Sequence, residues 1–250
     1  MKKILLIPDC QVRPGVPLEY LTSIGNYIIA KKPDYIVCIG DFADMPSLSS
    51  HDKAGSKDLE GMRYNEDIKS VWEGMGNLIG PLKSYKQRHP SYKPKLIMTL
   101  GNHEDRITRA IKNDPRFDKT IGLDDLAYKA MGWKVYPFLQ PVTICGITFC
   151  HYFCSGIMGR PIGTARALLS KMHVSCVAGH LPGRDIAFAR RADGSNMTGL
   201  IVGSCYDYDM PYLNHQTNAV WHGVYMLHNC QNGEFDEMSV PLSFLKKHYL

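Results

Sequence analysis

Four apolar segments of this chain are each followed by side chains that could bind a metal ion or carry a proton. The segments span 4–7, 35–39, 95–99 and 175–178, and the side chains after them are Asp9 and Gln11, Asp41 and Asp44, Asn102 and His103, and His180. Carboxylate, amide and imidazole groups are metal ligands, and histidine also exchanges protons near neutral pH. The segment Gly101–Asp105 alone could be a turn that caps a following helix. Four such endings in one chain favour a shared metal site instead.

The elements that would position these side chains alternate between strand and helix in the first half of the chain. The hydrophobic pattern predicts strands over 4–8, 35–39 and 95–100, and helices over 18–31, 59–85 and 105–112. This alternation is typical of a parallel sheet with crossover helices. The candidate side chains would then follow the C-terminal ends of the strands.

The second half of the chain is richer in strands. We expect a helix over 123–131, a strand over 133–136, a hairpin over 141–150 that turns at Cys145-Gly146, and a helix over 161–172. Short strands follow, with turns at Asp193-Gly194 and Asn232-Gly233. The order predicts two sheets that share one core, with helices outside. No repeat or linker marks a second unit, so we expect a single domain over residues 1–250.

Composition and charge are those of an ordinary globular protein. The chain has 250 residues, 44% hydrophobic and 21% charged. No apolar run approaches the roughly 18 residues that span a bilayer, and the short apolar start lacks a signal-peptide cleavage site. We therefore expect a cytoplasmic protein without a membrane partner. A net charge of +5 tolerates an anionic substrate without requiring nucleic acid.

The eight cysteines are expected to be buried free thiols. Several lie inside predicted strands and no C-x-x-C pair occurs, which fits a reducing compartment. Cys150 and Cys154 flank His151, but they lack matching partners elsewhere in the chain. We therefore do not expect a zinc site with thiolate ligands.

In order along the chain, the candidate residues resemble the calcineurin-like metallophosphoesterase family. Its pattern is D-x-H, G-D-x-x-D, G-N-H-[ED], a lone histidine after a strand, and G-H-x-H. The segments Gly40–Asp44 and Gly101–Glu104 match two blocks in full, His151 fits the lone histidine, and Gly179-His180 fits the start of the last block. The chain is also similar to stand-alone phosphoesterases encoded by phages, which would place it in the host cytoplasm.

The resemblance implies an α/β fold, a four-layer α/β/β/α sandwich in which two mixed sheets are flanked by helices. It also implies two divalent metal ions at the strand ends. By position, Asp41 would bridge the ions, His103 would face the scissile phosphate and Asp44 would orient that histidine. The implied ligands of one ion are Asn102, His151 and His180, those of the other are Asp9 and Gln11, and the arginines that could bind the substrate phosphate are Arg106, Arg160 and Arg184.

Such a site suits the hydrolysis of a phosphoester. Two ions about 3.5–4 Å apart would provide a metal-activated hydroxide at neutral pH and offset charge on the phosphoryl oxygens. With two carboxylates and one hydroxide, the centre would keep about one positive charge to attract phosphate. The mixed oxygen and imidazole ligands favour Mn²⁺, ahead of Fe, Zn²⁺, Mg²⁺ and Ni²⁺. The expected substrates are nucleotides or nucleic acids, hydrolysed by a phosphodiesterase, nuclease or phosphatase activity.

Two departures from the family pattern fall on the same ion. Gln11 stands where the first block has its histidine, and Pro182 stands where the last block has its second histidine. An amide oxygen is a weaker ligand than imidazole for borderline metals, and proline has no ligating side chain. We therefore expect the ion at Asp9 and Gln11 to be exchangeable and to be a hard ion such as Mn²⁺ or Mg²⁺.

A different class of function stays open, namely a catalytically weakened phosphate-binding or scaffolding module on the same fold. Retention of His103 and Asp44 argues against it, because binding alone needs no proton donor and no residue that orients one. A Rossmann-type nucleotide binder is disfavoured because the first strand leads to Pro8-Asp9-Cys10-Gln11 and not to a glycine-rich loop.

Overall fold

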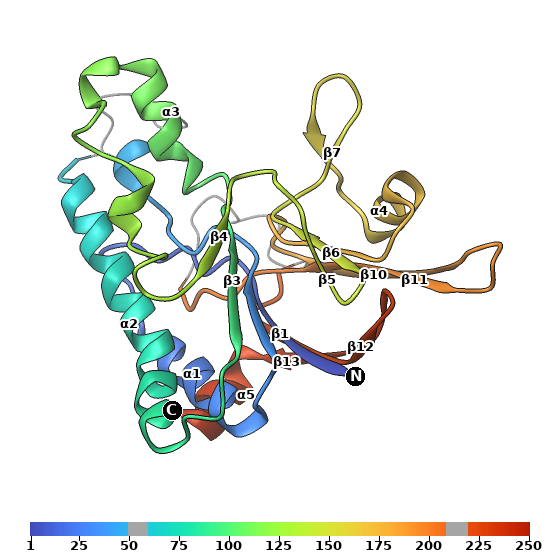
Figure 1. Cartoon of the computed structure of the whole chain (residues 1–250). Coiled ribbons are helices and arrows are strands. Elements are labelled where there is room, and N and C mark those ends of the chain that lie inside the picture. The colour runs from blue at the N-terminus through green and yellow to red at the C-terminus, as the bar shows by residue number, and fades with distance from the viewer. Residues whose placement is uncertain (50–59, 209–219) are drawn as a thin grey trace.

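In the computed structural model of the chain, two β-sheets pack face to face and helices cover their outer faces (Figure 1). The structure describes residues 1–49, 60–208 and 220–250. The first sheet has the strand order β13-β12-β1-β2-β3-β4, and the second has the order β10-β11-β9-β6-β5. This arrangement is the four-layer α/β/β/α sandwich expected from the sequence.

The bounds of the elements are as follows. The strands of the first sheet are β1 (Lys2–Ile7), β2 (Tyr35–Cys38), β3 (Lys95–Thr99), β4 (Lys134–Tyr136), β12 (Gly223–Gln231) and β13 (Glu234–Pro241). Those of the second are β5 (Val142–Ile144), β6 (Ile147–Cys150), β9 (Cys176–Ala178), β10 (Arg184–Arg190) and β11 (Asn196–Val202). A separate hairpin pairs β7 (Cys154–Ser155) with β8 (Arg160–Pro161). The α-helices are α1 (Glu19–Lys31), α2 (Tyr64–Arg88), α3 (Asp105–Asn113), α4 (Ala165–Met172) and α5 (Leu242–Tyr249), and short 3₁₀ turns are η1 (Pro46–Leu48), η3 (Pro115–Phe117) and η4 (Leu123–Leu126).

The side chains of β1 show how the first sheet is held between two apolar layers. Ile4 and Leu6 belong to the core between the sheets, whereas Leu5 and Ile7 belong to the core under the helices. Successive side chains on a strand point to opposite faces, so a run of apolar residues fills both layers. Strands β1, β2, β3 and β4 pair in parallel, which brings their carboxyl ends to one edge of the sheet.

Helices cover the two outer faces unequally. Helices α1, α2 and α5 lie on the outer face of the first sheet, and α4 lies against β10 and β11 of the second (Figure 1). Leu168 of α4 packs with Cys176 and Ile201 in a separate small core on that outer face. Among the described residues, no helix has both the length and the apolar character needed to cross a membrane.

Most predicted elements are present, and the differences have local causes. The predicted hairpins at residues 141–150, 193–194 and 232–233 are confirmed. The helix predicted over 123–131 is wrong, because the chain forms only the turn η4 and then adopts a left-handed conformation at Ala127, with φ 56°. Helix α4 begins at Ala165 instead of Pro161, because Thr164 caps it by accepting a hydrogen bond from the backbone N–H of Ala167. The prediction that helix α2 includes residues 60–63 is wrong, because Arg63 is extended, with φ −137° and ψ 131°, and the helix begins at Tyr64. The predicted first residue, 59, lies outside the described residues.

Candidate metal centre

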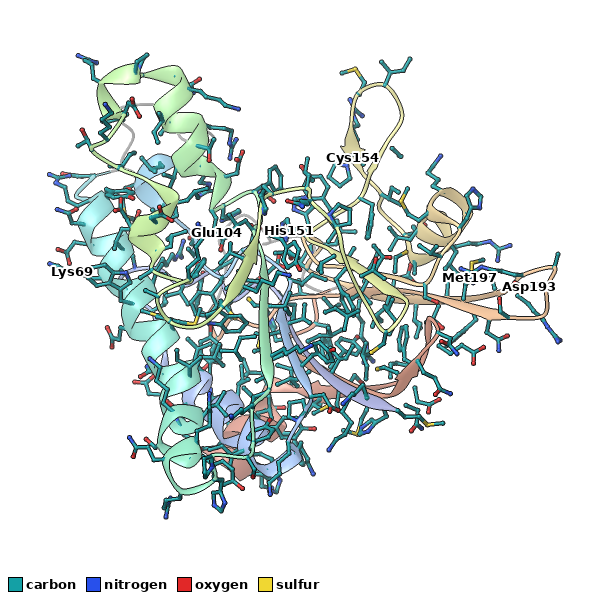
Figure 2. The ribbon with its side chains drawn as sticks, viewed as in Figure 1. Lys69, Glu104, His151, Cys154, Asp193 and Met197 are labelled. Atoms are coloured by element: carbon teal, nitrogen blue, oxygen red, sulfur yellow. The ribbon has the colours of Figure 1, made fainter. Side chains whose placement is uncertain are left out.

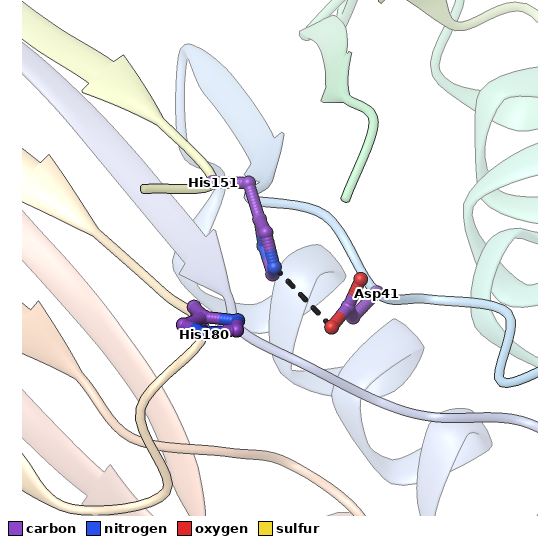
Figure 3. A group of neighbouring side chains, drawn as sticks. All are labelled: Asp41, His151 and His180. Atoms are coloured by element: carbon purple, nitrogen blue, oxygen red, sulfur yellow. Dashed lines mark ion pairs between the residues drawn. The ribbon is translucent and has the colours of Figure 1, made fainter. Parts of the chain in front are cut away.

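Ligand-type side chains from both sheets meet at one end of the sandwich. In Figure 2, Glu104 and His151 are labelled near the middle of the view, below α3 and the β7–β8 hairpin. Asp41 follows β2 of the first sheet, whereas His151 and His180 follow β6 and β9 of the second (Figure 3). One ligand atom of each of these three residues lies within 4.8 Å of the others. The centre is therefore built across the junction of the sheets.

Several lone pairs converge around the imidazole of His151. Its Nε2 lies 3.2 Å from Asp41 Oδ2 and 2.9 Å from Asn102 Oδ1, and its Nδ1 lies 2.9 Å from the carbonyl oxygen of Ile39. A neutral imidazole that donates from Nδ1 to Ile39 directs the lone pair of Nε2 at the two oxygens. The lone pairs of His151 Nε2, Asp41 Oδ2 and Asn102 Oδ1 then repel one another unless a proton or a cation lies among the three atoms. A backbone carbonyl that fixes the imidazole is a common partner of metal-binding histidines, so these residues fit a divalent ion.

The charges of this group depend on one another. Burial opposes ionisation of Asp41, but the positive charges of His103 and His151 hold its pKa below the ordinary value. Burial also disfavours a charged His151, but Asp41 outweighs burial and raises the pKa of His151 to about 9. Burial, followed by the charge of His151, lowers the pKa of His180 to about 4, so its imidazole is neutral at pH 7 and offers a lone pair. A divalent ion would replace the His151 proton in balancing Asp41.

Asp9 and Gln11 are buried beside this group. Asp9 is 2% exposed, its Oδ1 accepts a hydrogen bond from the backbone N–H of His180 at 3.2 Å, and burial raises its pKa to about 7. Gln11 is 5% exposed, and within the described part of the chain its Oε1 has no hydrogen-bond donor. A buried acceptor without a donor costs about 1–3 kcal/mol. A cation would satisfy this oxygen, so Gln11 fits a metal-binding role, whereas Asp9 is not among the three residues whose ligand atoms lie within 4.8 Å of one another.

His103 and Asp44 form a hydrogen-bonded pair next to Asp41. Nδ1 of His103 donates to Asp44 Oδ1 at 2.7 Å, and its Nε2 lies 3.7 Å from Asp41 Oδ2. Burial lowers the pKa of His103, but the charges of Asp41 and Asp44 outweigh burial and raise it above the ordinary value. The imidazole of His103 is therefore protonated more readily than that of a free histidine. The contact between Asp44 and His103 expected from the sequence is present in the structure.

The three arginines that the sequence suggested for phosphate binding lie in three different parts of the molecule. Arg106 is buried, and its Nη1 donates to the carbonyl oxygen of Asp44 at 2.8 Å, which places it at the centre. Arg160 is exposed on the β7–β8 hairpin. Arg184 donates to Ser239 Oγ at 3.2 Å and its guanidinium lies over the Trp221 ring.

Arg13 is a residue of this region that the sequence reasoning missed. Its Nη1 lies 3.4 Å from Asp44 Oδ2, and its guanidinium lies 4.7 Å from the centre of the Tyr208 ring. The side chain keeps 27% of its surface exposed. The only sequence signal is its position two residues after Gln11, in the segment that follows the first strand.

Glu104 joins the loops that carry the candidate ligands. Its Oε2 accepts hydrogen bonds from the backbone N–H groups of Asp41 at 3.0 Å and Gly101 at 2.8 Å, and its Oε1 accepts from Ala43 at 2.9 Å. The Tyr128 hydroxyl donates to Oε1 at 3.3 Å. The sequence shows Glu104 only as the end of a motif, and its role as an acceptor for a loop more than 60 residues away has no local signature.

The backbone at the centre is held in unusual conformations. Gln11, Asp41, Met45 and His180 all lie in the left-handed region, with φ values of 45°, 48°, 53° and 69°. Residues other than glycine rarely adopt this backbone conformation, and those that do are often found at functional sites. The close approach of the loops also explains Gly101, because a Cβ there would collide with the Asp41 carboxylate.

Comparisons with known proteins give one match that bears on family. The model of the calcineurin-like phosphoesterase family matches residues 2–195. Among solved structures, the chain is similar to YfcE, a phosphoesterase from E. coli, with 12% identity and a TM-score of 0.39 over 96% of this chain and 99% of that chain. At this TM-score the likeness adds nothing to the family match. No curated protein sequence matches the chain.

Proposed function

The chain belongs to the calcineurin-like phosphoesterase family and is therefore a metal-dependent hydrolase of phosphoesters, and from this premise we propose a dinuclear centre that acts on nucleotide or nucleic-acid phosphates. Asp41, Asn102, His151 and His180 hold one divalent ion in this proposal. Asp9 and Gln11 hold the other, with Asp41 shared between the two. When bound, two such ions lower the pKa of water and offset charge on phosphoryl oxygens.

One observation carries the proposal, which is the proton donor placed beside the candidate ligands. His103 is fixed by its 2.7 Å hydrogen bond from Nδ1 to Asp44, and its Nε2 lies 3.7 Å from Asp41 Oδ2. A protonated Nε2 would donate to the oxygen of the leaving group as the ester bond breaks. Asp44 keeps the proton on Nδ1 and so orients the ring. Positioned acid catalysis of this kind contributes about 10²–10⁴ in rate.

Two arginines next to Asp44 support the binding of an anionic ester. Arg106 Nη2 lies 3.4 Å from His103 Nε2, and Arg13 is the more exposed of the two. Their charges lie where a phosphate in contact with His103 would need donors, and guanidinium groups suit phosphate oxygens. We propose that Arg106 holds Asp44 in place and that Arg13 reaches the ester. Arg160 and Arg184 stay weaker candidates, because their contacts lie on the hairpin and at Ser239.

The choice of ion follows from the ligand chemistry. Two imidazole groups, two amide groups and two carboxylates favour Mn²⁺ over Ca²⁺, with Fe, Zn²⁺, Mg²⁺ and Ni²⁺ as alternatives. The orphan oxygen of Gln11 adds an oxygen ligand without adding charge. We propose that the ion at Asp9 and Gln11 exchanges more readily than the ion at His151 and His180.

A screen of metals against substrates tests the proposal. Metal-stripped protein is supplied with Mn²⁺, Mg²⁺, Zn²⁺ or Ni²⁺ and offered aryl phosphates, bis-aryl phosphodiesters, nucleotides, and short DNA and RNA. We expect hydrolysis of nucleotides or nucleic acids with Mn²⁺, two ions per chain by metal analysis, and loss of both ions and of activity in Asp41→Ala. Asp193→Ala, in the exposed β10–β11 hairpin, is the control and should retain both.

Three results would contradict parts of the proposal. An active Asp41→Ala variant that keeps two ions would exclude the shared carboxylate. A single tightly bound ion at full activity would exclude the dinuclear centre. Two bound ions without hydrolysis of any ester would favour the phosphate-binding module instead.

A further inference from the structure

A cavity of about 770 Å³ opens beside the candidate centre, between α3, η4 and the segment that follows β4. Its volume lies within the range of about 300–1,000 Å³ that is usual for ligand sites. Much of its lining is apolar. The apolar side chains include Leu100, Leu123, Ala130, Val135 and Phe138.

Residues that line the cavity adjoin the candidate centre on two sides. Leu100 and Asp105 line it and directly flank the segment that carries Asn102 and His103. On the other side, the ring of Phe138 lies 5.5 Å from that of Tyr152.

The rings of Phe138 and Tyr152 form an aromatic wall that extends from the cavity to the candidate ligands. The ring centre of Phe138 lies 6.4 Å from that of His151, and the ring centre of Tyr152 lies 4.7 Å from that of His180. A molecule held at the centre would thus meet an aromatic wall that leads into the cavity.

The charges around the cavity balance. Lys112 and Lys129 lie on its lining with Asp105 and Asp124, and Lys129 Nζ pairs with Asp124 Oδ1 at 3.3 Å. A balanced rim gives no attraction for a phosphate, in contrast to the region of Arg13. The cavity therefore suits the uncharged part of an ester whose phosphate lies at the centre.

We propose that this cavity binds a planar aromatic ring on the leaving-group side of the phosphoester, and this rests on the proposed function. An aryl group bonded directly to the phosphate and a nucleobase share this chemistry. They differ in reach, because a ribose separates a nucleobase from its phosphate. Burial of the ring against Phe138 and the aliphatic lining provides the affinity.

Two pairs of esters and one pair of phosphonates test the inference on the metal-loaded full chain. Phenyl and 1-naphthyl phosphate have similar leaving groups and differ by one fused ring, and ribose 5-phosphate and AMP differ by the base. We expect KM to fall by about tenfold with the larger ring in at least one pair, because more apolar surface is buried. Calorimetry with benzylphosphonate and 1-naphthylmethylphosphonate, which are not hydrolysed, measures the same preference without turnover.

Substitutions identify the cavity as the source of the preference. Thr108 lies on α3 and lines the cavity, so Thr108→Trp should fill it and bring the ratio of KM values, and of phosphonate affinities, close to one. Ser170→Trp, on the exposed face of α4, is the matched control and should keep both ratios. Urea unfolding of each variant shows whether it is folded, and Ala130→Trp is a second cavity-filling variant at an exposed position.

The outcomes separate this inference from the proposed function. Preference in the aryl pair alone assigns the cavity to a ring bonded directly to the phosphate, and preference in the AMP pair alone assigns it to a nucleobase. Equal KM values in both pairs, with equal phosphonate affinities, would overturn the inference while hydrolysis itself stood. No hydrolysis with any metal, but tighter 1-naphthylmethylphosphonate binding that Thr108→Trp removes, would overturn the proposed function and leave the cavity assigned.

Discussion

Replacing Glu104 by glutamine tests how the candidate centre is held together. The Glu104 carboxylate accepts three backbone N–H groups from two loops and one phenol hydroxyl. Glutamine has the same shape but only one acceptor oxygen. With that oxygen toward Asp41 and Gly101, its amide NH₂ faces the N–H of Ala43, while the Tyr128 hydroxyl can rotate to accept from it. One buried N–H therefore loses its acceptor.

The expected cost follows from these contacts. One orphaned buried N–H costs about 1–3 kcal/mol. The two remaining bonds lose their charged acceptor, and charged acceptors give roughly twice the strength of neutral ones. An opposing effect reduces the total, because burial and then the charge of Asp41 raise the pKa of Glu104, so removing its charge relieves repulsion. We expect a net loss of about 2–3 kcal/mol in the free energy of unfolding, which lowers Tm by about 4–12 °C in a chain of this size.

Thermal and urea unfolding in the presence of a chelator measure this loss without a contribution from bound ions. Tyr128→Phe is the control, because it removes only the 3.3 Å hydrogen bond and should cost below about 1 kcal/mol. The metal-loaded Glu104→Gln variant should also lose kcat, since Glu104 positions the loops of both Asp41 and Asn102. An unchanged Tm, or an equal loss in Tyr128→Phe, would refute this account of the Glu104 carboxylate.

Three further predictions concern single side chains. His103→Ala should keep its ions and fold but lose about 10²–10⁴ in kcat, and metal analysis that shows lost ions would make His103 a ligand. Gln11→His should bind the exchangeable ion more tightly, since imidazole is the better ligand for borderline metals, and a calorimetric titration with Mn²⁺ that shows no change would mean that another group fills this role. Burial raises the pKa of Asp67 to about 6, so the folded state favours its neutral form, and its contribution to stability, present below about pH 4, is lost as pH rises through 6. Asp67→Asn should therefore reduce the fall in unfolding free energy between pH 4 and pH 7 by up to about 3 kcal/mol, and an undiminished fall would assign it to other groups.

The strands and hairpins were predictable because their signals are local. Short runs of apolar residues predict β1, β2 and β3, and glycine turns predict the hairpins, without reference to any long-range contact. The turn η4 was not predictable, because packing of Leu126 and a left-handed Ala127 end it after one turn. An apolar pattern over 123–131 does not show where tertiary contacts will stop a helix.

The residues of the candidate centre likewise include some that the sequence reveals and some that it does not. Side chains that directly follow strands, such as Asp41 and His151, were found because the strand ends are visible in the sequence. Groups that act through another segment were missed: Arg13 reaches Asp44, and Glu104 accepts from the loop of Ala43. The aromatic wall at Phe138 was missed too, because it forms where α3, η4 and the segment after β4 come together.

The left-handed backbone at Gln11 and His180 lowers the stability of this chain at the positions where it places proposed ligands. Each such residue costs about 1–2 kcal/mol that glycine would not. A library selected only for heat resistance should therefore accumulate glycine or asparagine at positions 11 and 180. Both residues are proposed ligands, so the selected variants would become more stable and lose activity in the same steps, unless catalysis is selected alongside.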